Sequence, residues 1–325
     1  MPYADLPLEQ LRGHVSSSVE PPDFDEFWAE TLAQARAHDK QPTFTITNNG
    51  LSLIDTYDVR FPGFQGQPVA GWLHVPSGTT EPLPCIVQYI GYGGGRGLAH
   101  ENTLWATAGF ATLVMDTRGQ GSHLSTGVTP DPEGSGPAHA GVMTRGITDP
   151  HTYYYRRLIT DAVRAVDAAR THPLIDPARI IVAGASQGGG LAIAAGALAD
   201  DVAAVLPDVP FLCDFPRATW IASRAPYDEI VRYAATHRDQ IDQVARTLSY
   251  IDGVHFAARA TTPALFSVAL MDPTCPPSTV YAAYNAWTGP KQMREYQFNG
   301  HEGGGAFHTA EQLTWLAELR SPARR

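Results

Sequence analysis

The feature that most constrains the fold of this chain is the stretch IIVAGASQGGG at residues 180–190. The apolar residues 180–183 predict a buried strand, and the small and apolar residues after the glycines predict a buried helix. Between them lies G-A-S-Q-G, which places Ser186 on a sharp turn from strand to helix, the setting of a nucleophilic serine. The flanking glycines allow the close backbone approach that such a turn requires. Glycine-rich turns of this kind are also common in α/β proteins generally, so the pattern alone leaves both interpretations open.

Strand patterns alternate with helix patterns along the rest of the chain. Segments that predict strands lie at residues 51–61, 67–76, 84–90, 110–116, 180–183, 202–211 and 262–272, and in KQMREYQ from residue 291. Segments that predict helices lie at residues 21–37, 152–171, about 276–287 and about 305–320. Strands that alternate with helices favour a mostly parallel central sheet with helices on both faces, so we predict an α/β fold of that kind. The segments at 51–61 and 67–76 are expected to pair antiparallel.

The 325 residues are enough to bury a large core, and we predict a single domain over residues 1–325. Residues 1 to about 40 are expected to form an N-terminal helical extension. Residues of about 214–259, which are rich in helix formers and charge, are expected to form a small helical insertion.

Charge and cysteine usage exclude several classes of protein. Lys and Arg number 23 against 33 Asp and Glu, a net charge of −10 without any basic stripe, which argues against a nucleic-acid partner. No apolar stretch reaches the roughly 18 residues that a membrane-spanning helix needs, and the first residues do not resemble a secretory signal. The 3 cysteines (Cys85, Cys213 and Cys275) are scattered, as expected of isolated thiols in a reducing compartment and not of a metal site. We therefore expect a soluble, cytoplasmic protein.

A serine hydroxyl needs a histidine base and a carboxylate that orients that base. Asp272 ends a predicted strand and His301 follows the next one, so both come after Ser186 in the chain order serine, acid, histidine. The chain holds 12 histidines, and most histidines in proteins are not bases. Asp208 also ends a predicted strand and remains an alternative acid. Asp272 is favoured because it directly precedes the element that leads to His301.

Such a serine also needs two backbone N–H groups that bind the oxyanion of the tetrahedral intermediate. We predict that Gln187, directly after the serine, supplies one, and that Tyr92 in the loop YIGYGGG supplies the other. The alternative for this loop is a simple glycine-rich turn. No G-K-[ST] follows it and no G-x-G-x-x-G occurs, so neither a phosphate loop nor a dinucleotide site is predicted, and no cofactor is expected.

With these residues assembled, the chain closely resembles the acetyl xylan esterase and cephalosporin C deacetylase family. The resemblance rests on DTRGQG (116–121), GASQGGG (184–190) and GHE (300–302), joined by longer matches from about residue 5 to 320. It implies the α/β-hydrolase fold, no cofactor, and removal of O-linked acetyl groups from small acetylated sugars and from cephalosporin C. Carried over by position, Ser186 is the nucleophile, His301 the base and Asp272 its orienting acid, with Tyr92 and Gln187 at the oxyanion hole.

The resemblance implies further residue roles and an assembly. Pro210, Phe211 and Pro226, together with Tyr92, would border a small acyl pocket. Arg118 and Gln120 match family markers and are expected to brace loops. The family implies a homo-oligomer, commonly a hexamer. The segment 122–141, rich in Gly, Ser, Pro and His, departs from the family pattern, and substrate preference could differ if it borders the active-site entrance.

These observations predict a serine esterase that removes acetyl groups from small acetylated carbohydrates, and from cephalosporin C, through an acetyl-enzyme intermediate. A general short-chain carboxylesterase is the alternative. A serine peptidase of the oligopeptidase type is disfavoured because 325 residues leave no room for the large propeller domain that such peptidases carry. A non-catalytic binding protein of this fold is disfavoured because no member of the triad is missing.

Overall fold

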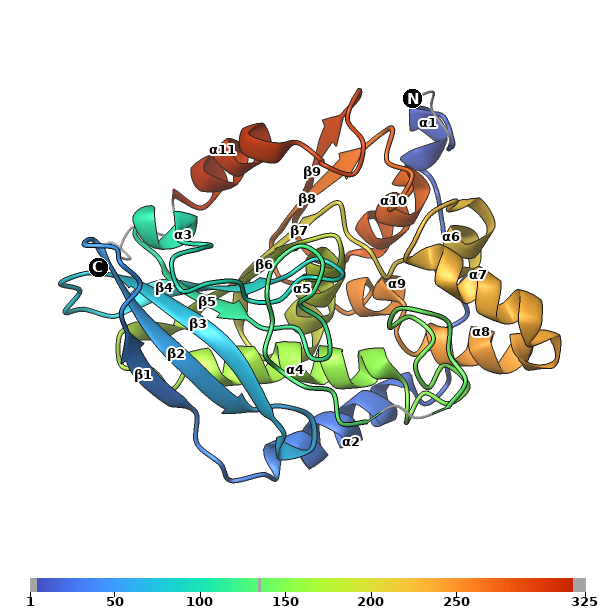
Figure 1. Ribbon diagram of the computed structural model, residues 1–325. Coiled ribbons are helices and arrows are strands. Elements are labelled where there is room, and N and C mark those ends of the chain that lie inside the picture. The colour runs from blue at the N-terminus through green and yellow to red at the C-terminus, as the bar shows by residue number, and fades with distance from the viewer. Residues whose placement is uncertain (1–4, 134–135, 318–325) are drawn as a thin grey trace.

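The computed structural model describes residues 5–133 and 136–317, and its centre is one 9-stranded sheet (Figure 1). Its strands are β1 (Thr43–Thr47), β2 (Ile54–Pro62), β3 (Pro68–Pro76), β4 (Leu83–Tyr89), β5 (Ala111–Met115), β6 (Ile175–Ala185), β7 (Val202–Asp208), β8 (Ala264–Ala269) and β9 (Lys291–Tyr296). Their order across the sheet is β1-β2-β3-β5-β4-β6-β7-β8-β9.

The sheet is antiparallel at one edge and parallel elsewhere. β1, β2, β3 and β5 pair antiparallel, and all neighbours from β5 to β9 run parallel. The predicted pairing of 51–61 with 67–76 is confirmed by β2 and β3, whose register brings Pro62 opposite Pro68. The edge strand β1 was not predicted, because its sequence TFTIT is polar at most positions and no residue of it is fully buried.

Helices cover both faces of the sheet, as predicted. They are α1 (Leu8–Leu11), α2 (Phe24–Arg36), α3 (Leu104–Thr107), α4 (Tyr154–Ala169), α5 (Gln187–Leu198), α6 (Phe215–Ile221), α7 (Tyr227–Thr236), α8 (Ile241–Ser249), α9 (Gly253–Ala257), α10 (Pro277–Ala286) and α11 (Gly305–Trp315), with 3-10 turns η1 (Phe64–Gly66) and η2 (Arg238–Gln240). α4 and α5 lie on one face, while α3 and α11 lie on the other (Figure 1).

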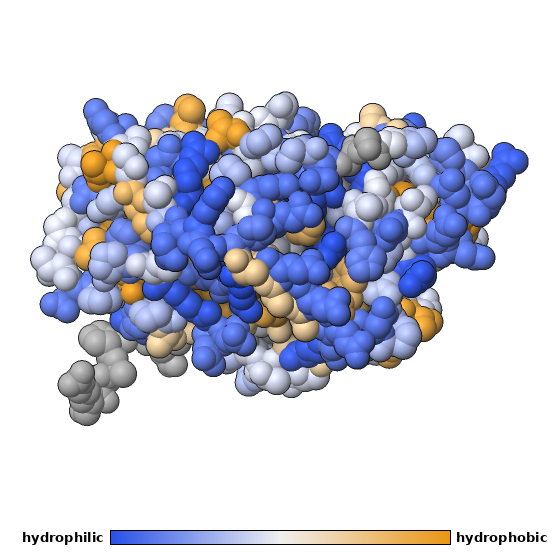
Figure 2. Space-filling model, turned by 90° about the horizontal axis from the view of Figure 1, so that it is seen from below, coloured by the Kyte–Doolittle hydropathy of each residue, from blue (hydrophilic) through white to orange (hydrophobic). Residues whose placement is uncertain are grey.

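The strand β4 illustrates how two cores arise from one sheet. Successive side chains of a strand point to opposite faces. Cys85 and Val87 therefore join the larger core with α4 and α5, whereas Ile86 joins a smaller core with Trp105 and Leu316. The surface seen in Figure 2 is largely hydrophilic, with only small hydrophobic areas.

Three predictions about single elements need correction. The segment 202–211 was expected to be a strand throughout, but β7 ends at Asp208. The segment 262–272 was expected to remain a strand to Asp272, but β8 ends at Ala269, and the Asp272 N–H donates a hydrogen bond to the Ala269 carbonyl in a turn. In the segment 152–171 the apolar residues at helical spacing mark one face, which predicts a helix buried on that face alone. The helix α4 is instead buried on nearly all sides, including Arg156 and Arg157. This helix packs against the sheet, α2 and α5 at once, so few of its positions reach solvent.

The predicted helical insertion contains α6, α7, α8 and α9. Apolar residues of these helices belong to the larger core that also contains α2 and the sheet. Among the described residues, no helix combines the length and the hydrophobicity needed to cross a membrane.

Candidate active site

Ser186 occupies a sharp turn between β6 and α5. Its backbone has φ 57° and ψ −118°, outside the regions that non-glycine residues prefer. The Ser186 N–H donates to the Asp208 carbonyl (2.9 Å), and the Ser186 carbonyl accepts from the Phe211 N–H (2.9 Å). These two hydrogen bonds tie the turn to β7 and the loop that follows it.

The glycines on either side of Ser186 are required by close backbone contacts. A Cβ atom on Gly188 would lie 2.3 Å from the Tyr89 carbonyl oxygen, and one on Gly184 would lie 2.5 Å from the carbonyl of Gly188. Any larger residue would push β6, α5 and β4 apart. The glycines of G-A-S-Q-G therefore have the steric role that the sequence predicted for them.

The structure brings the side chains of Ser186, His301 and Asp272 into one hydrogen-bonded chain. His301 Nε2 lies 3.0 Å from Ser186 Oγ, and His301 Nδ1 lies 2.8 Å from Asp272 Oδ2. The other oxygen, Asp272 Oδ1, accepts the N–H groups of Thr274 (2.8 Å) and Cys275 (3.0 Å). The Asp272 side chain is fully buried, whereas 34% of the His301 side chain remains exposed. This arrangement holds the imidazole with its proton on Nδ1 and leaves Nε2 free to accept the serine proton.

Asp208, the alternative acid, contacts other partners. Its carboxylate accepts a hydrogen bond from Ser267 Oγ and lies 3.9 Å from His308 Nε2. Within the described residues it forms no hydrogen bond or ion pair with His301. Geometry therefore favours Asp272 as the partner of His301, since only Asp272 reaches its Nδ1.

The two residues expected to donate to an oxyanion lie at the start of α5 and in the loop after β4. Across residues 5–133 and 136–317, neither the Gln187 N–H nor the Tyr92 N–H has an acceptor in the protein. Backbone N–H groups in folded proteins are almost always paired, with protein, water or ligand. The unpaired Gln187 N–H directly follows the serine in the chain, and both unpaired amides are suited to binding an anionic oxygen.

Gln120 connects these two segments, in agreement with its expected bracing role. Its Oε1 accepts the N–H of Gly93 (2.6 Å), and its Nε2 donates to Gln187 Oε1 (2.9 Å) and to the Tyr154 hydroxyl (2.8 Å). One side chain thus contacts the neighbour of Tyr92 and the side chain of Gln187. In the described part of the chain, Gln120 forms no hydrogen bond with Ser186, which fits a role in loop geometry.

Arg118 lies in a buried group of charges away from Ser186. Its guanidinium donates to both oxygens of Asp161 (2.5 and 2.8 Å) and to Asp131 (3.3 Å), and Arg157 also pairs with Asp131 (2.8 Å). Asp161 further accepts the N–H of Phe64 (2.9 Å). Arg118 thereby braces the loop after β5 against α4, as its match to the family marker suggested.

The three expected acyl-pocket residues are placed differently from one another. Phe211 is fully buried, bonds to the Ser186 carbonyl through its N–H, and packs edge-on against Tyr227 with ring centroids 4.3 Å apart. Pro210 lies next to it in the loop after β7 and approaches Gly189 of α5. Pro226, which follows a cis peptide bond, is the residue before α7. The first two are therefore adjacent to the turn, and Pro226 belongs to the insertion.

The segment 122–141 starts directly against the loop of residues 91–95, which contains Tyr92. The N–H groups of Ser122 and His123 both donate to the Gly93 carbonyl (3.2 and 3.1 Å), and Ser122 forms an isolated bridge with Thr126. Residues 134–135 of this segment lie outside the described part of the chain. The contact with Gly93 supports the expectation that this segment borders the site.

Sequence reasoning gave no role to Cys275, which lies beside Asp272 and His301, or to Glu229, whose carboxylate accepts a hydrogen bond from the Tyr92 hydroxyl. Cys275 lies in the turn after Asp272, and the ligand atoms of Asp272, Cys275 and His301 all lie within 4.8 Å of one another. Such a trio could hold a metal ion, but burial raises the pKa of the Cys275 thiol well above its ordinary value, which disfavours the thiolate that a metal requires. Both lie in stretches that resemble the family, LMDPTCPPSTVYAAYN and APYDEIVRY, but only spatial proximity shows what they contact.

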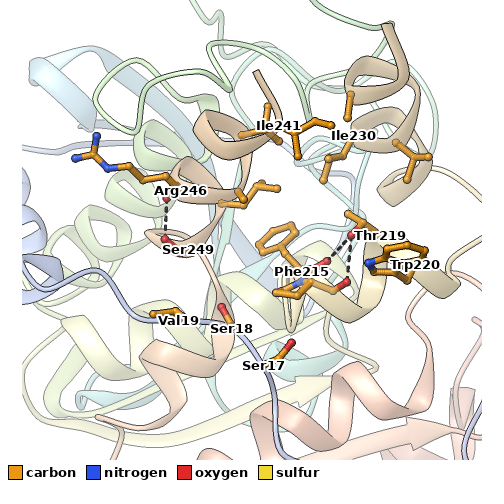
Figure 3. A pocket seen from close by; sticks show the side chains of 16 residues that line it. Ser17, Ser18, Val19, Phe215, Thr219, Trp220, Ile230, Ile241, Arg246 and Ser249 are labelled. Atoms are coloured by element: carbon orange, nitrogen blue, oxygen red, sulfur yellow. Dashed lines mark hydrogen bonds between the residues drawn. The ribbon is translucent and has the colours of Figure 1, made fainter. Parts of the chain in front are cut away.

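A large apolar hollow of about 660 Å³ lies elsewhere, within the helical insertion (Figure 3). Side chains such as Phe215, Trp220, Ile230 and Ile241 surround it, and Val19 approaches from the N-terminal segment. No member of the hydrogen-bonded chain at Ser186 lines this hollow. We therefore do not assign this hollow as the candidate active site, although it is large.

Comparison with known proteins agrees with this geometry. The family model for acetyl xylan esterases matches residues 1–319. The chain belongs to the acetyl xylan esterase family. This assignment confirms the predicted family and enzyme class, a serine ester hydrolase, and the solved relatives confirm the predicted α/β-hydrolase fold.

Two solved esterases share the whole fold with this member of the family. An acetyl xylan esterase from Paenibacillus sp. R4 is 40% identical, with a TM-score of 0.91 over 96% of this chain and 99% of the other. Acetyl xylan esterase 1 from Thermoanaerobacterium sp. JW/SL YS485 is 31% identical, with a TM-score of 0.88 over 98% of this chain and 100% of the other.

A curated relative, acetyl esterase Axe7A from Xylanibacter ruminicola, is 27% identical over 310 residues. The match covers 91% of this chain and spans 66% of the length of that relative.

Proposed function

We propose that this protein is a serine esterase that removes O-acetyl groups from small acetylated carbohydrates, through an acetyl-enzyme intermediate. The observation that carries the proposal is the continuous hydrogen-bonded chain from Asp272 through His301 to Ser186. The serine in it lies on a strained turn and is followed directly by the unpaired N–H of Gln187. This combination suits attack on an ester carbonyl.

In the first half of the proposed reaction, His301 Nε2 takes the proton of Ser186 Oγ as that oxygen attacks the acetyl carbon. The carbonyl oxygen becomes negative and is bound by the N–H groups of Gln187 and Tyr92. When the intermediate collapses, the bond between the acetyl carbon and the sugar oxygen breaks. The imidazolium of His301 donates its proton to that leaving oxygen, and the acetyl group remains bound to Ser186 Oγ as an ester.

In the second half, His301 takes a proton from water, whose oxygen attacks the acetyl carbon of the acetyl-serine. The same two amides bind the new oxyanion. Collapse breaks the bond to Ser186 Oγ, which receives the proton from His301, and acetic acid leaves. Asp272 stays ionised throughout and stabilises the imidazolium in each half-reaction.

Support for an acetyl group comes from the bulky residues next to the turn and from the relatives. Pro210 and Phe211 adjoin Ser186 through α5 and the Ser186 carbonyl, and we propose that they and Pro226 limit the acyl chain. Similar proteins are named acetyl xylan esterases or an acetyl esterase. We propose cephalosporin C as a second substrate, because it also carries an acetyl ester.

The deciding experiment measures acetate released from acetylated xylo-oligosaccharides and from cephalosporin C, together with hydrolysis of p-nitrophenyl esters of increasing acyl length. We expect acetate from both acetylated compounds and a collapse of activity beyond short acyl chains, all lost in Ser186→Ala. Activity that persists with long acyl chains, without sugar deacetylation, would instead identify a general carboxylesterase. Hydrolysis of peptide amides in preference to esters would favour the peptidase alternative.

We also propose a homo-oligomer, on the basis of the family resemblance. Sedimentation velocity of the purified chain tests this proposal. A single species at the monomer mass of 35.1 kDa would contradict it.

A further inference from the structure

We propose that Glu229, on α7 of the helical insertion, is a positioning residue for the oxyanion hole. It holds the side chain of Tyr92, and thereby the backbone N–H that Tyr92 presents to the substrate. The inference rests on the proposed function, in which this N–H binds the oxyanion. It goes beyond that function because it gives the helical insertion a part in the chemistry.

The carboxylate of Glu229 joins two loops at one point. The Tyr92 hydroxyl donates to Glu229 Oε1 (2.7 Å) and accepts the N–H of Val142 (2.7 Å). The second oxygen, Glu229 Oε2, accepts the N–H of Met143 (3.2 Å). A Cβ atom on Gly141 would lie 2.3 Å from Glu229 Oε2, so the backbone at 141–143 closes directly over the carboxylate.

Burying the carboxylate of Glu229 at this position costs free energy of folding. It is 5% exposed, and burial raises the pKa of its carboxyl above the ordinary value, although the hydrogen bonds from Tyr92 and Met143 oppose the shift. No cation forms an ion pair with it among the described residues. A buried carboxylate without a counter-ion costs stability unless its hydrogen bonds compensate. An apolar residue would fill the same space without that cost, so a role in holding Tyr92 accounts better for the carboxylate.

Tyr92 needs such an anchor because its loop has little structure of its own. Residues 91–95 read GYGGG and contain neither a helix nor a strand. Gln120 holds the loop from one side, through Gly93 (2.6 Å). Glu229 holds it from the other, through the Tyr92 hydroxyl. Oxyanion donors act only when they lie about 2.7–3.1 Å from the developing charge, and a displacement of about 1 Å can cost about 100-fold in rate.

The test uses Tyr92→Phe, Glu229→Gln and the double variant of the full chain. Tyr92→Phe keeps the ring and the backbone N–H but removes the hydroxyl contact. Glu229→Gln keeps one acceptor for Tyr92 but turns an NH₂ group toward the Met143 N–H. We expect each single change to lower kcat for p-nitrophenyl acetate by about 10- to 100-fold, with KM nearly unchanged, because only transition-state binding is weakened. The double variant should be slowed by less than the product of the two single effects, since both changes act on the same anchor of Tyr92.

The matched control is Asp228→Asn, which removes a neighbouring carboxylate whose partner is the exposed Arg232 (3.1 Å). It should keep the wild-type kcat. Thermal unfolding of every variant separates the two possible roles. A lower melting temperature with unchanged kcat in Tyr92→Phe and Glu229→Gln would overturn the inference, as would a rise in KM alone.

A second measurement separates this inference from the identity of the substrate. Diethyl p-nitrophenyl phosphate labels a reactive serine and places a phosphoryl oxygen in the oxyanion hole, whatever ester the enzyme prefers. We expect labelling of Ser186 to slow in Tyr92→Phe and Glu229→Gln by a factor similar to that in kcat. If the wild-type protein is labelled but hydrolyses no acetyl ester, the proposed function fails, and the labelling rates of the variants still decide the role of Glu229. Equal labelling rates in wild type and variants would refute that role.

Discussion

Both oxygens of the Asp272 carboxylate have hydrogen-bond partners. Oδ2 faces His301 Nδ1, and Oδ1 accepts two backbone N–H groups of the turn that follows β8. This turn exists because β8 ends three residues before Asp272, and it points the carboxylate toward His301. Asp208 ends its strand directly and is directed toward Ser267 instead.

The predicted consequence concerns Asp272→Asn. In the variant the amide oxygen is needed by the N–H groups of Thr274 and Cys275, so the NH₂ group faces His301 Nδ1 and donates to it. The imidazole proton then lies on Nε2, which can no longer accept the serine proton, so we expect kcat to fall by about 10⁴-fold. Asp208→Asn is the matched control and should keep activity close to wild type. Steady-state hydrolysis of p-nitrophenyl acetate measures both. A comparable loss in Asp208→Asn, with Asp272→Asn active, would reverse the assignment of the acid.

His74 on β3 gives a prediction about stability. It is fully buried, with Nδ1 2.9 Å from Thr56 Oγ1, and burial lowers the pKa of its imidazole from 6.5 to about 4. The folded protein therefore keeps His74 neutral, while the unfolded chain takes up a proton below about pH 6.5. The free energy of unfolding should fall as the pH drops from about 6.5 to 4, by about 3 kcal/mol in all from this group.

The measurement is urea unfolding at several pH values in wild type and in His74→Leu. Other groups titrate equally in both proteins, so the difference between the two curves reports His74. The stability of wild type relative to the variant should decrease across this pH range and become constant below it. Parallel curves would show that His74 does not contribute.

At the level of elements, β6, α5 and β4 meet at the turn that carries Ser186. Gly188 is the point of closest approach, because a Cβ there would lie 2.3 Å from the backbone of β4. Gly188→Ala should cost about 1–3 kcal/mol of unfolding free energy, as overpacked sites do. It should also reduce kcat, because displacement of α5 moves the Gln187 N–H.

Urea unfolding and steady-state kinetics of Gly188→Ala check both effects. Gly13→Ala is the control, because its added Cβ would meet only one atom, 4.0 Å away. This control should leave kcat and stability close to wild type. A Gly188→Ala protein with normal stability and normal kcat would show that the close contact relaxes without consequence.

For the molecule as a whole, we propose that residues 1–325 behave as one domain. The larger core contains residues of the N-terminal α2, the sheet, and the insertion helices α7 and α8 together. The buried charges around Arg118 connect further parts: the loop after β5, α4 and the 3-10 turn η1. Both features join segments that are far apart in the sequence.

Arg118→Met tests this connection. The change leaves the carboxylates of Asp161 and Asp131 buried without the Arg118 guanidinium, so the free energy of unfolding should fall by about 3–5 kcal/mol. The control is Arg36→Met, whose pair with Asp167 is partly exposed and should contribute about 1 kcal/mol or less. Urea unfolding followed by circular dichroism and by tryptophan fluorescence should give one coincident transition in wild type and in both variants. Separate transitions would argue that the insertion or the N-terminal extension unfolds independently.

The sequence by itself was enough to predict the alternating strands and helices, the turn at Ser186, and the order in which Asp272 and His301 follow it. These features depend on local patterns: apolar periodicity, glycine spacing and the positions of polar residues after strands. It also allowed recognition of the family, since the motifs lie in the same order along the chain. The edge strand β1 carried no such pattern and was missed.

Only the tertiary structure decided which carboxylate meets His301, why α4 is buried on nearly all sides, and that Glu229 reaches Tyr92. Each depends on segments that come together only after folding: β8 beside β9, α4 beneath the sheet, and α7 over the oxyanion loop. Local sequence patterns do not determine such tertiary contacts, because the same side chain takes different partners according to how the elements pack around it.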